Sequence, residues 1–97
     1  MTEKKLQSLF VQFLNDNWIY HIKTIVCSRA GVPDIIACIG GKFVAFELKG
    51  TDGRTSELQK WNGEKIKLSG GKFYIVTPDN YREIIDTALH TQRTGAR

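Results

Sequence analysis

Apolar residues near the start of the chain recur every three or four positions, which is the spacing of one helix face. They are Leu6, Leu9, Phe10, Phe13 and Leu14. Thr2 is a suitable N-cap for this helix, and the polar segment 15–17 ends it. From Trp18 to Cys27 the pattern changes to one typical of a β-strand. We therefore expect a helix followed by a strand.

Two runs of β-branched and aromatic residues follow, 34–39 and 42–49, joined by a Gly-Gly pair at 40–41. A glycine pair in this position is typical of a two-residue hairpin turn. The register that this turn sets places Asp34 directly opposite Glu47. The second run is apolar on both faces until Glu47, which predicts a central strand covered by helices on both sides.

The second half of the chain alternates between helix and strand patterns. A helix is expected to start at a cap formed by Ser56 or Thr55 and to run to about Leu68. Its register is set by Leu58, Trp61, Lys65 and Leu68. A short strand is expected at 72–77, and a last helix opens after Pro78.

The expected order of elements is αβββαβα. This order predicts an α/β fold in which a mixed central sheet is flanked by helices. The 97 residues show no internal repeat and no second domain. We expect one domain over residues 1–90 and a polar, frayed C-terminal tail over residues 91–97.

The composition of the chain indicates which class of molecule the protein binds and in which cellular compartment we expect it. The net charge of +4 and the pI near 9.2 favour an anionic partner, and nucleic acid is the commonest one for a small basic domain. Cys27 and Cys38 lack zinc-site spacing and lie in predicted strands, so we expect small buried thiols, with a disulfide as the less favoured interpretation. The chain shows no signal-peptide pattern and no apolar run as long as a membrane span, so we expect a cytoplasmic protein, of a cell or of a virus inside one, without a membrane partner.

Asp34 and Glu47 are the candidate chemical site. Opposed strand residues have Cβ atoms roughly 5 Å apart, so the two carboxylates repel each other unless something compensates. Mg²⁺ is the natural candidate because it prefers carboxylate oxygens, and Mn²⁺ could replace it. Lys49 shares a face with Glu47, since strand side chains alternate. An ion here would polarise a phosphoryl oxygen and activate a bound water, while Lys49 stabilised the developing negative charge.

The segments 31–34 (Gly-Val-Pro-Asp) and 46–49 (Phe-Glu-Leu-Lys) resemble the PD-(D/E)xK nuclease superfamily. Glu3 on the first helix and Gln59 on the second extend the resemblance to the virus-type replication-repair nuclease domain, VRR-NUC, in its stand-alone form. The resemblance runs from about Glu3 to Pro78 and covers most of the chain.

This resemblance implies a restriction-endonuclease-like core and a metal-dependent phosphodiesterase. By motif position it implies that Asp34 and Glu47 bind the metal, joined by the backbone carbonyl of Leu48. The implied catalytic set is Asp34, Glu47, Lys49, Gln59 and Glu3. Stand-alone members of the family resemble Holliday-junction resolving enzymes in fold and in forming dimers, so the resemblance also implies a homodimer.

Further residues are candidates for contact with the DNA backbone. They are Lys4, Lys5, Arg29, Gly31, Arg54 and Lys60. Trp18 and Trp61 could stack on exposed bases, although their spacing is more typical of core residues. Glu3 is explained equally well as the acid in the first turn of a helix, and Gln59 as a solvated helix residue.

The leading hypothesis is a Mg²⁺-dependent DNA endonuclease that is selective for branched DNA such as Holliday junctions, in the repair of cellular or phage DNA. Two alternatives stay open: a non-catalytic nucleic-acid-binding module on the same fold, and a restriction-like duplex endonuclease. The chain has little room for base-reading insertions, so the last alternative ranks lower. A two-fold dimer would offer two sites to a symmetric junction, through exposed apolar residues of the last helix or of segment 18–25.

Overall fold

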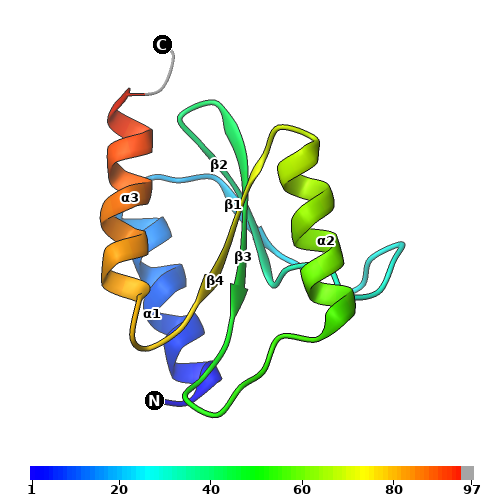
Figure 1. Ribbon diagram of the computed structural model, residues 1–97. Coiled ribbons are helices and arrows are strands. Elements are labelled where there is room, and N and C mark those ends of the chain that lie inside the picture. The colour runs from blue at the N-terminus through cyan, green and yellow to red at the C-terminus, as the bar shows by residue number, and fades with distance from the viewer. Residues whose placement is uncertain (95–97) are drawn as a thin grey trace.

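One mixed four-stranded sheet, with strand order β1-β2-β3-β4, carries three helices (Figure 1). The pairs β1–β2 and β2–β3 are antiparallel, and β3–β4 is parallel. This computed structural model describes residues 1–94. The elements are α1 (Glu3–Asp16), β1 (His21–Lys23), β2 (Ile35–Ile39), β3 (Lys42–Leu48), α2 (Glu57–Leu68), β4 (Lys72–Val76) and α3 (Tyr81–Thr94). The expected α/β fold, with a mixed sheet between helices, is confirmed.

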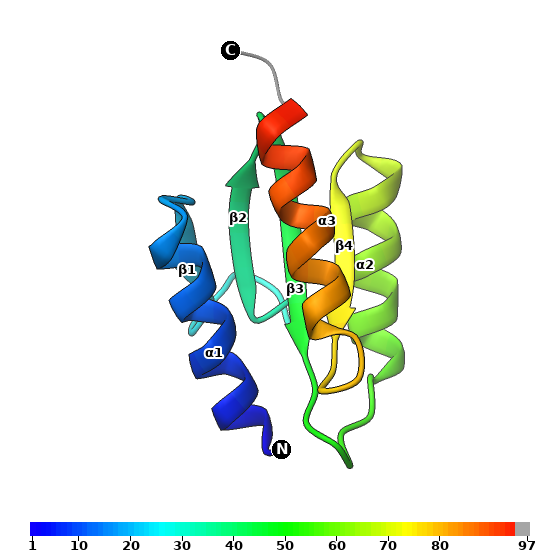
Figure 2. The same ribbon diagram turned by 90° about the vertical axis from the view of Figure 1, so that its left-hand side faces the viewer.

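The helices cover the two faces of the sheet unequally. α1 and α3 lie on one face, and α2 lies alone on the other (Figure 2). Val44, Phe46 and Leu48 of β3 are buried on the side of α1 and α3, as the alternation of strand side chains requires. The same core contains Leu6, Phe10, Phe13, Leu14, Ile19, Ile35, Ala37, Ile39, Val76, Ile84 and Ala88. β3 is therefore the central, two-sided strand that its sequence predicts.

The hairpin between β2 and β3 has the expected register. Both turn glycines, at 40–41, have positive φ values of 59° and 80°, as a tight hairpin turn of this kind requires. The ladder ends with Ile35 opposite Phe46. Asp34 and Glu47 are the next pair in this register, at the edge of the sheet where β2 begins and β3 ends.

α2 approaches the sheet most closely at Gly63, which has no side chain. Its bounds agree with the predicted helix, but the predicted register is wrong. The buried residues are Asn62 and Gly63, because Gly63 lets the helix backbone come close to the ring of Phe73. The four residues that set the predicted register are exposed instead: Leu58, Trp61, Lys65 and Leu68.

Gly63→Ala is expected to destabilise the protein by about 1–3 kcal/mol, although alanine is the better helix former. The new Cβ would lie 2.4, 2.5 and 2.9 Å from three ring atoms of Phe73, so the helix or the ring must move. Urea unfolding followed by circular dichroism measures this loss. A second substitution, Phe73→Leu, should recover part of it. A Gly63→Ala protein as stable as the wild type would contradict this packing.

β1 is much shorter than the strand predicted over 18–27. The ladder with β2 ends where the N–H of Thr24 donates to the carbonyl of Asp34 at 2.9 Å. The apolar residues after Thr24 therefore lie in a loop, 25–33, rather than in a strand.

Several residues that were expected inside the protein lie on its surface. Cys27 and Cys38 are free and exposed, so the prediction of buried thiols is wrong. Cys27 belongs to the loop after β1, and Cys38 points to the part of the sheet that α2 leaves uncovered. Trp18 is 96% exposed and Trp61 is 51% exposed, so neither is a core residue.

α3 extends beyond the expected end of the domain at residue 90. It continues to Thr94, so residues 91–94 of the predicted frayed tail are helical. Nε2 of Gln92 donates to the carbonyl of Asn17 at 2.9 Å and links α3 to the end of α1. The rest of that tail, residues 95–97, lies outside the described residues. Among residues 1–94, no helix combines the length and apolar character needed to cross a membrane.

Candidate metal and catalytic site

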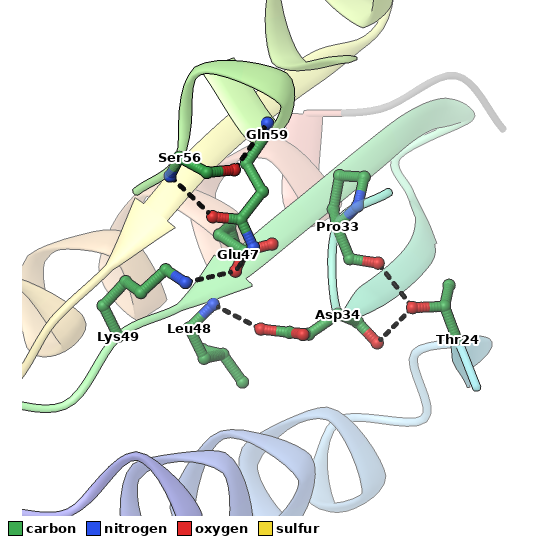
Figure 3. A network of polar contacts seen from close by, with 8 residues as sticks. All are labelled: Thr24, Pro33, Asp34, Glu47, Leu48, Lys49, Ser56 and Gln59. Atoms are coloured by element: carbon green, nitrogen blue, oxygen red, sulfur yellow. Dashed lines mark hydrogen bonds and ion pairs between the residues drawn. The ribbon is translucent and has the colours of Figure 1, made fainter. Parts of the chain in front are cut away.

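The carboxylate of Glu47 is buried where the end of β3 meets the first turn of α2 (Figure 3). Its side chain is 1% exposed. β2 and β4 flank β3 on its two sides, and α2 covers this face of the sheet. An acid is therefore held in a position from which the fold excludes most water, which is rare unless the charge is paired or liganded.

The two oxygens of Glu47 have different surroundings. Oε2 accepts a hydrogen bond from Nε2 of Gln59 at 2.9 Å and lies 3.1 Å from Nζ of Lys49. Oε1 is buried and has no hydrogen-bond partner among residues 1–94. A buried polar atom without a partner is unfavourable, so Oε1 is available for a ligand that carries positive charge.

Burial raises the pKa of Glu47 from its ordinary value of 4.5 to about 7. The hydrogen bond and the positive charge of Lys49 oppose this rise, while the negative charges of Asp34 and Glu3 add to it. The raised pKa shows that the ammonium of Lys49 does not fully compensate a charge at Glu47. Additional positive charge at this position would favour the ionised carboxylate.

Asp34 reaches the same edge from the start of β2. Its Oδ2 accepts a hydrogen bond from the backbone N–H of Leu48 at 2.9 Å. In a strand, the N–H and the carbonyl of one residue point to the same side. The carbonyl of Leu48 therefore points to the side of Asp34, where the sequence expects a metal ligand.

Gln59 is held at both ends of its amide group. Oγ of Ser56 accepts from the N–H of Gln59 at 3.1 Å, and Oε1 of Gln59 accepts from the N–H of Ser56 at 2.9 Å (Figure 3). This is a capping box at the start of α2. Because a donor occupies Oε1, the amide NH₂ must point to Glu47. Gln59 thus fixes the carboxylate of Glu47 through the bond to Oε2.

Glu3 lies at the rim of this site. It is exposed at the start of α1, and its charge is near enough to raise the pKa of Glu47. Its backbone N lies against Gly50, where an added Cβ would be 2.6 Å away. Within residues 1–94, no group of three or more His, Cys, Asp or Glu side chains is placed to hold a metal ion. The residues that the structure brings together are Asp34, Glu47, Leu48, Lys49 and Gln59.

The predicted DNA-contacting residues are distributed over several elements. Exposed positions of α1, α2 and the loops before β2 and α2 hold Lys4, Lys5, Arg29, Arg54 and Lys60. Lys60 is paired with Glu57 at 3.3 Å. Gly31 has a φ of 75°, and a Cβ there would lie 2.6 Å from Cγ of Leu58. The need for glycine at this position thus follows from packing against α2, besides any contact with a phosphate.

Two residues that the sequence does not single out support the site. Oγ1 of Thr24 donates to the carbonyls of Pro33 at 2.6 Å and Asp34 at 3.2 Å. Nδ2 of Asn62, which is buried, donates to the carbonyl of Ala30 at 3.2 Å and holds the loop before Asp34 against α2. Neither residue belongs to a motif that could have revealed this role. The Ser-x-x-Gln spacing at 56–59, in contrast, is a recognisable capping-box signal.

The oxygen atoms of Asp34, Glu47 and Leu48 fit a hard divalent cation. Two carboxylates and a backbone carbonyl are oxygen ligands of the kind that Mg²⁺ and Mn²⁺ prefer, and Oε1 of Glu47 has no other partner. Comparisons with protein-family models, with curated proteins and with solved structures find no match to this chain.

Proposed function

We propose that this protein is a Mg²⁺-dependent endodeoxyribonuclease of the PD-(D/E)xK type, similar to stand-alone VRR-NUC domains with a restriction-endonuclease-like core. The observation that carries the proposal is Oε1 of Glu47, a buried carboxylate oxygen without a hydrogen-bond partner, beside Asp34 and Lys49. A bound Mg²⁺, or Mn²⁺ in its place, supplies a Lewis acid and a water of lowered pKa.

Each residue of the site has a separate part in this proposal. Asp34 and Glu47 hold the ion, and the carbonyl of Leu48 completes the protein ligands. Lys49 is only 13% exposed, so its charge acts in a partly desolvated place, where it stabilises negative charge on the phosphate more strongly than in water. Gln59 keeps Glu47 in position through the bond to Oε2.

The substrate that fits best is DNA recognised by its shape. The chain has a net charge of +4, and exposed lysines and arginines lie on the elements that meet at this site. Contacts of this kind go to phosphates and carry little sequence information. We therefore propose cleavage of branched DNA, such as Holliday junctions, in preference to a defined duplex sequence.

The test is a panel of end-labelled junction, flap, single-stranded and duplex DNA, incubated with Mg²⁺, with Mn²⁺ or with EDTA. Cleavage that requires metal and is fastest on the branched substrates supports the proposal. Cleavage of a defined duplex sequence would identify a restriction-like enzyme instead.

The second candidate is a non-catalytic nucleic-acid-binding module. It is favoured by one observation, the lack of a third acidic or histidine side chain beside Asp34 and Glu47 within residues 1–94. This candidate predicts DNA binding that survives EDTA and no cleavage of any substrate in the panel with either metal.

Ser56→Pro is expected to weaken Mn²⁺ binding by about 10- to 100-fold, and Ser56→Ala to leave it nearly unchanged. Proline suits the φ of −73° at this position but lacks the N–H that holds Oε1 of Gln59, whereas alanine keeps it. Both variants lose the side-chain cap, at a cost of about 1 kcal/mol in the free energy of unfolding. This loss is common to both, so it does not explain a difference in Mn²⁺ affinity between them. Isothermal titration calorimetry measures the affinities. Equal affinities in the two variants would show that the N–H of Ser56 does not orient Gln59.

We also propose a homodimer that forms through the apolar segment after α1. β1 is an edge strand, and such an edge beside exposed apolar side chains favours association. The exposed residues are Trp18, Tyr20, Ile22, Ile25 and Val26. α3 is less suitable, because it buries Ile84 and Ala88 in the core.

Sedimentation velocity at micromolar concentration is expected to show a dimer of the wild type. The double substitution Ile22→Lys and Val26→Lys places charges in the proposed contact and should give a monomer. As a control, Leu68→Lys, at an exposed position of α2, should leave the dimer intact. A monomeric wild type would contradict the proposal.

A further inference from the structure

A pocket of about 470 Å³ opens on the sheet face that α2 covers only in part. Its apolar lining comes from the loop before β2, from β2 and β3, and from α2: Pro33, Ile36, Phe43 and Ile66. We call it the strand pocket. Its volume is within the range of sites that hold small molecules or single groups of a larger ligand.

The strand pocket lies on the same face of the sheet as the candidate metal site. Side chains two positions apart on a strand share a face, so Ile36 lies on the same face as Asp34, and Phe43 on the same face as Glu47. Ile36 is one such step from Asp34, about 7 Å along the strand, and Phe43 is two steps from Glu47, about 13 Å. Pro33, in the pocket wall, directly precedes Asp34 in the chain. A ligand in the pocket would therefore lie beside a phosphate at the acid pair.

The charges at the rim of the pocket define the ligand further. Arg29 and Lys65 line it together with the apolar side chains, and no Asp or Glu is among its described lining residues. Phe43 is 48% exposed and offers an aromatic surface to a flat partner. An apolar, aromatic cavity with cations at its mouth is complementary to a planar ring attached to an anion, which is the chemistry of a nucleotide.

We propose that the strand pocket binds one unpaired nucleobase of the DNA substrate, next to the phosphodiester at the acid pair, with Arg29 and Lys65 at its phosphate. This inference rests on the proposed nuclease function and adds a substrate requirement to it: an unpaired nucleotide beside the cut. Neither an intact duplex nor a fully paired four-way junction can supply such a base without unstacking one, so among the branched substrates the pocket favours flaps, and it also favours single-stranded ends.

The test separates the base from the phosphates. Fluorescence anisotropy in EDTA measures binding of two labelled short strands, one fully abasic and one abasic except for a single central thymine. Both strands carry the same phosphates. The wild type is expected to bind the thymine strand about 10-fold more tightly, as one stacked base contributes. Phe43→Ser should remove this preference, and Leu68→Ser, at an exposed apolar position outside the pocket, should keep it.

A second variant guards against a folding defect in the first. Ser69→Trp, at an exposed position of the pocket wall, should fill the cavity and remove the same preference. It leaves Ile36 and Phe43 of the sheet unchanged. Arg29→Gln should weaken binding of both strands equally, because it acts on the phosphate.

Three outcomes would overturn the inference. The first is an equal affinity of the wild type for both strands, and the second is a preference that survives in Phe43→Ser and Ser69→Trp. The third is a Phe43→Ser protein that changes from dimer to monomer in sedimentation and keeps the wild-type preference, which would make this face a contact between copies. Cleavage with Mg²⁺ but no base preference would support the nuclease function and reject base binding in the strand pocket. Base preference without cleavage would support base binding and reject the nuclease function.

Discussion

Glu47→Gln is expected to abolish Mg²⁺-dependent cleavage, with a loss of at least about 10⁴-fold in rate, as for other groups that act as part of a catalytic unit. Glutamine keeps the size of the side chain and an oxygen that can accept from Gln59. It removes the negative charge that a hard cation requires. Initial rates on the best substrate of the panel, with enzyme in excess, measure the effect.

The matched control is Glu57→Gln. It makes the same chemical change on α2, at a side chain that is 92% exposed and paired only with Lys60. Its cleavage rate should equal that of the wild type. If Glu47→Gln retained activity within about tenfold of the wild type, a general base or metal ligand at Glu47 would be excluded, since such losses are far larger.

The second large effect is on stability in the absence of metal, which should fall as the pH rises from about 5 to about 8. Burial raises the pKa of Glu47 from 4.5 to about 7, so between these values the folded protein binds a proton that the unfolded chain has released. The contribution of Glu47 to stability is therefore complete below pH 4.5 and is lost as the pH passes through about 7. The full change corresponds to about 3 kcal/mol at most.

Chemical unfolding in EDTA at a series of pH values measures this slope. Other groups also titrate, so the informative quantity is the difference between the wild type and Glu47→Gln, which has no proton to lose at this position. The difference should shrink to nothing in acid and grow towards pH 8. A pH-independent difference would mean that Glu47 has an ordinary pKa.

Added Mg²⁺ should reverse the fall of stability with rising pH. Metal binds the ionised carboxylate, so its affinity rises as the pH passes through the pKa of Glu47. Binding to the folded state alone stabilises it, and the stabilisation should be larger at pH 8 than at pH 6 in the wild type and absent in Glu47→Gln. Equal stabilisation of both proteins would place the ion elsewhere.

The hairpin and its acid pair were predictable because their information is local. The glycines at 40–41 set the turn, the turn sets the register, and the register places Asp34 opposite Glu47. The pattern of β3 likewise predicted its central place in the sheet. The starts of α1 and α2 follow from caps at Thr2 and Ser56, which are also local signals.

The wrong predictions concern features that depend on contacts with a distant part of the chain. The spacing of Leu58, Trp61, Lys65 and Leu68 predicts the register of α2. The close approach between Gly63 and Phe73 instead turns that face to the solvent. β1 is shorter than the pattern of residues 18–27 predicts, because its length is set by pairing with β2, and only residues 21–23 pair with residues 35–37 of that distant segment. Both outcomes depend on partners that no periodicity reveals.

The sequence alone determined which groups meet: two acids opposed in a hairpin and a lysine on the same face, since register and alternation follow from neighbouring residues. Only the tertiary structure decided the state of those groups. α2 and β4 close over Glu47 and exclude water, the capping box turns the amide of Gln59 to Oε2, and Oε1 is left without a partner. Burial and hydrogen-bond satisfaction depend on every segment that packs around an atom, so they are properties of the assembled fold.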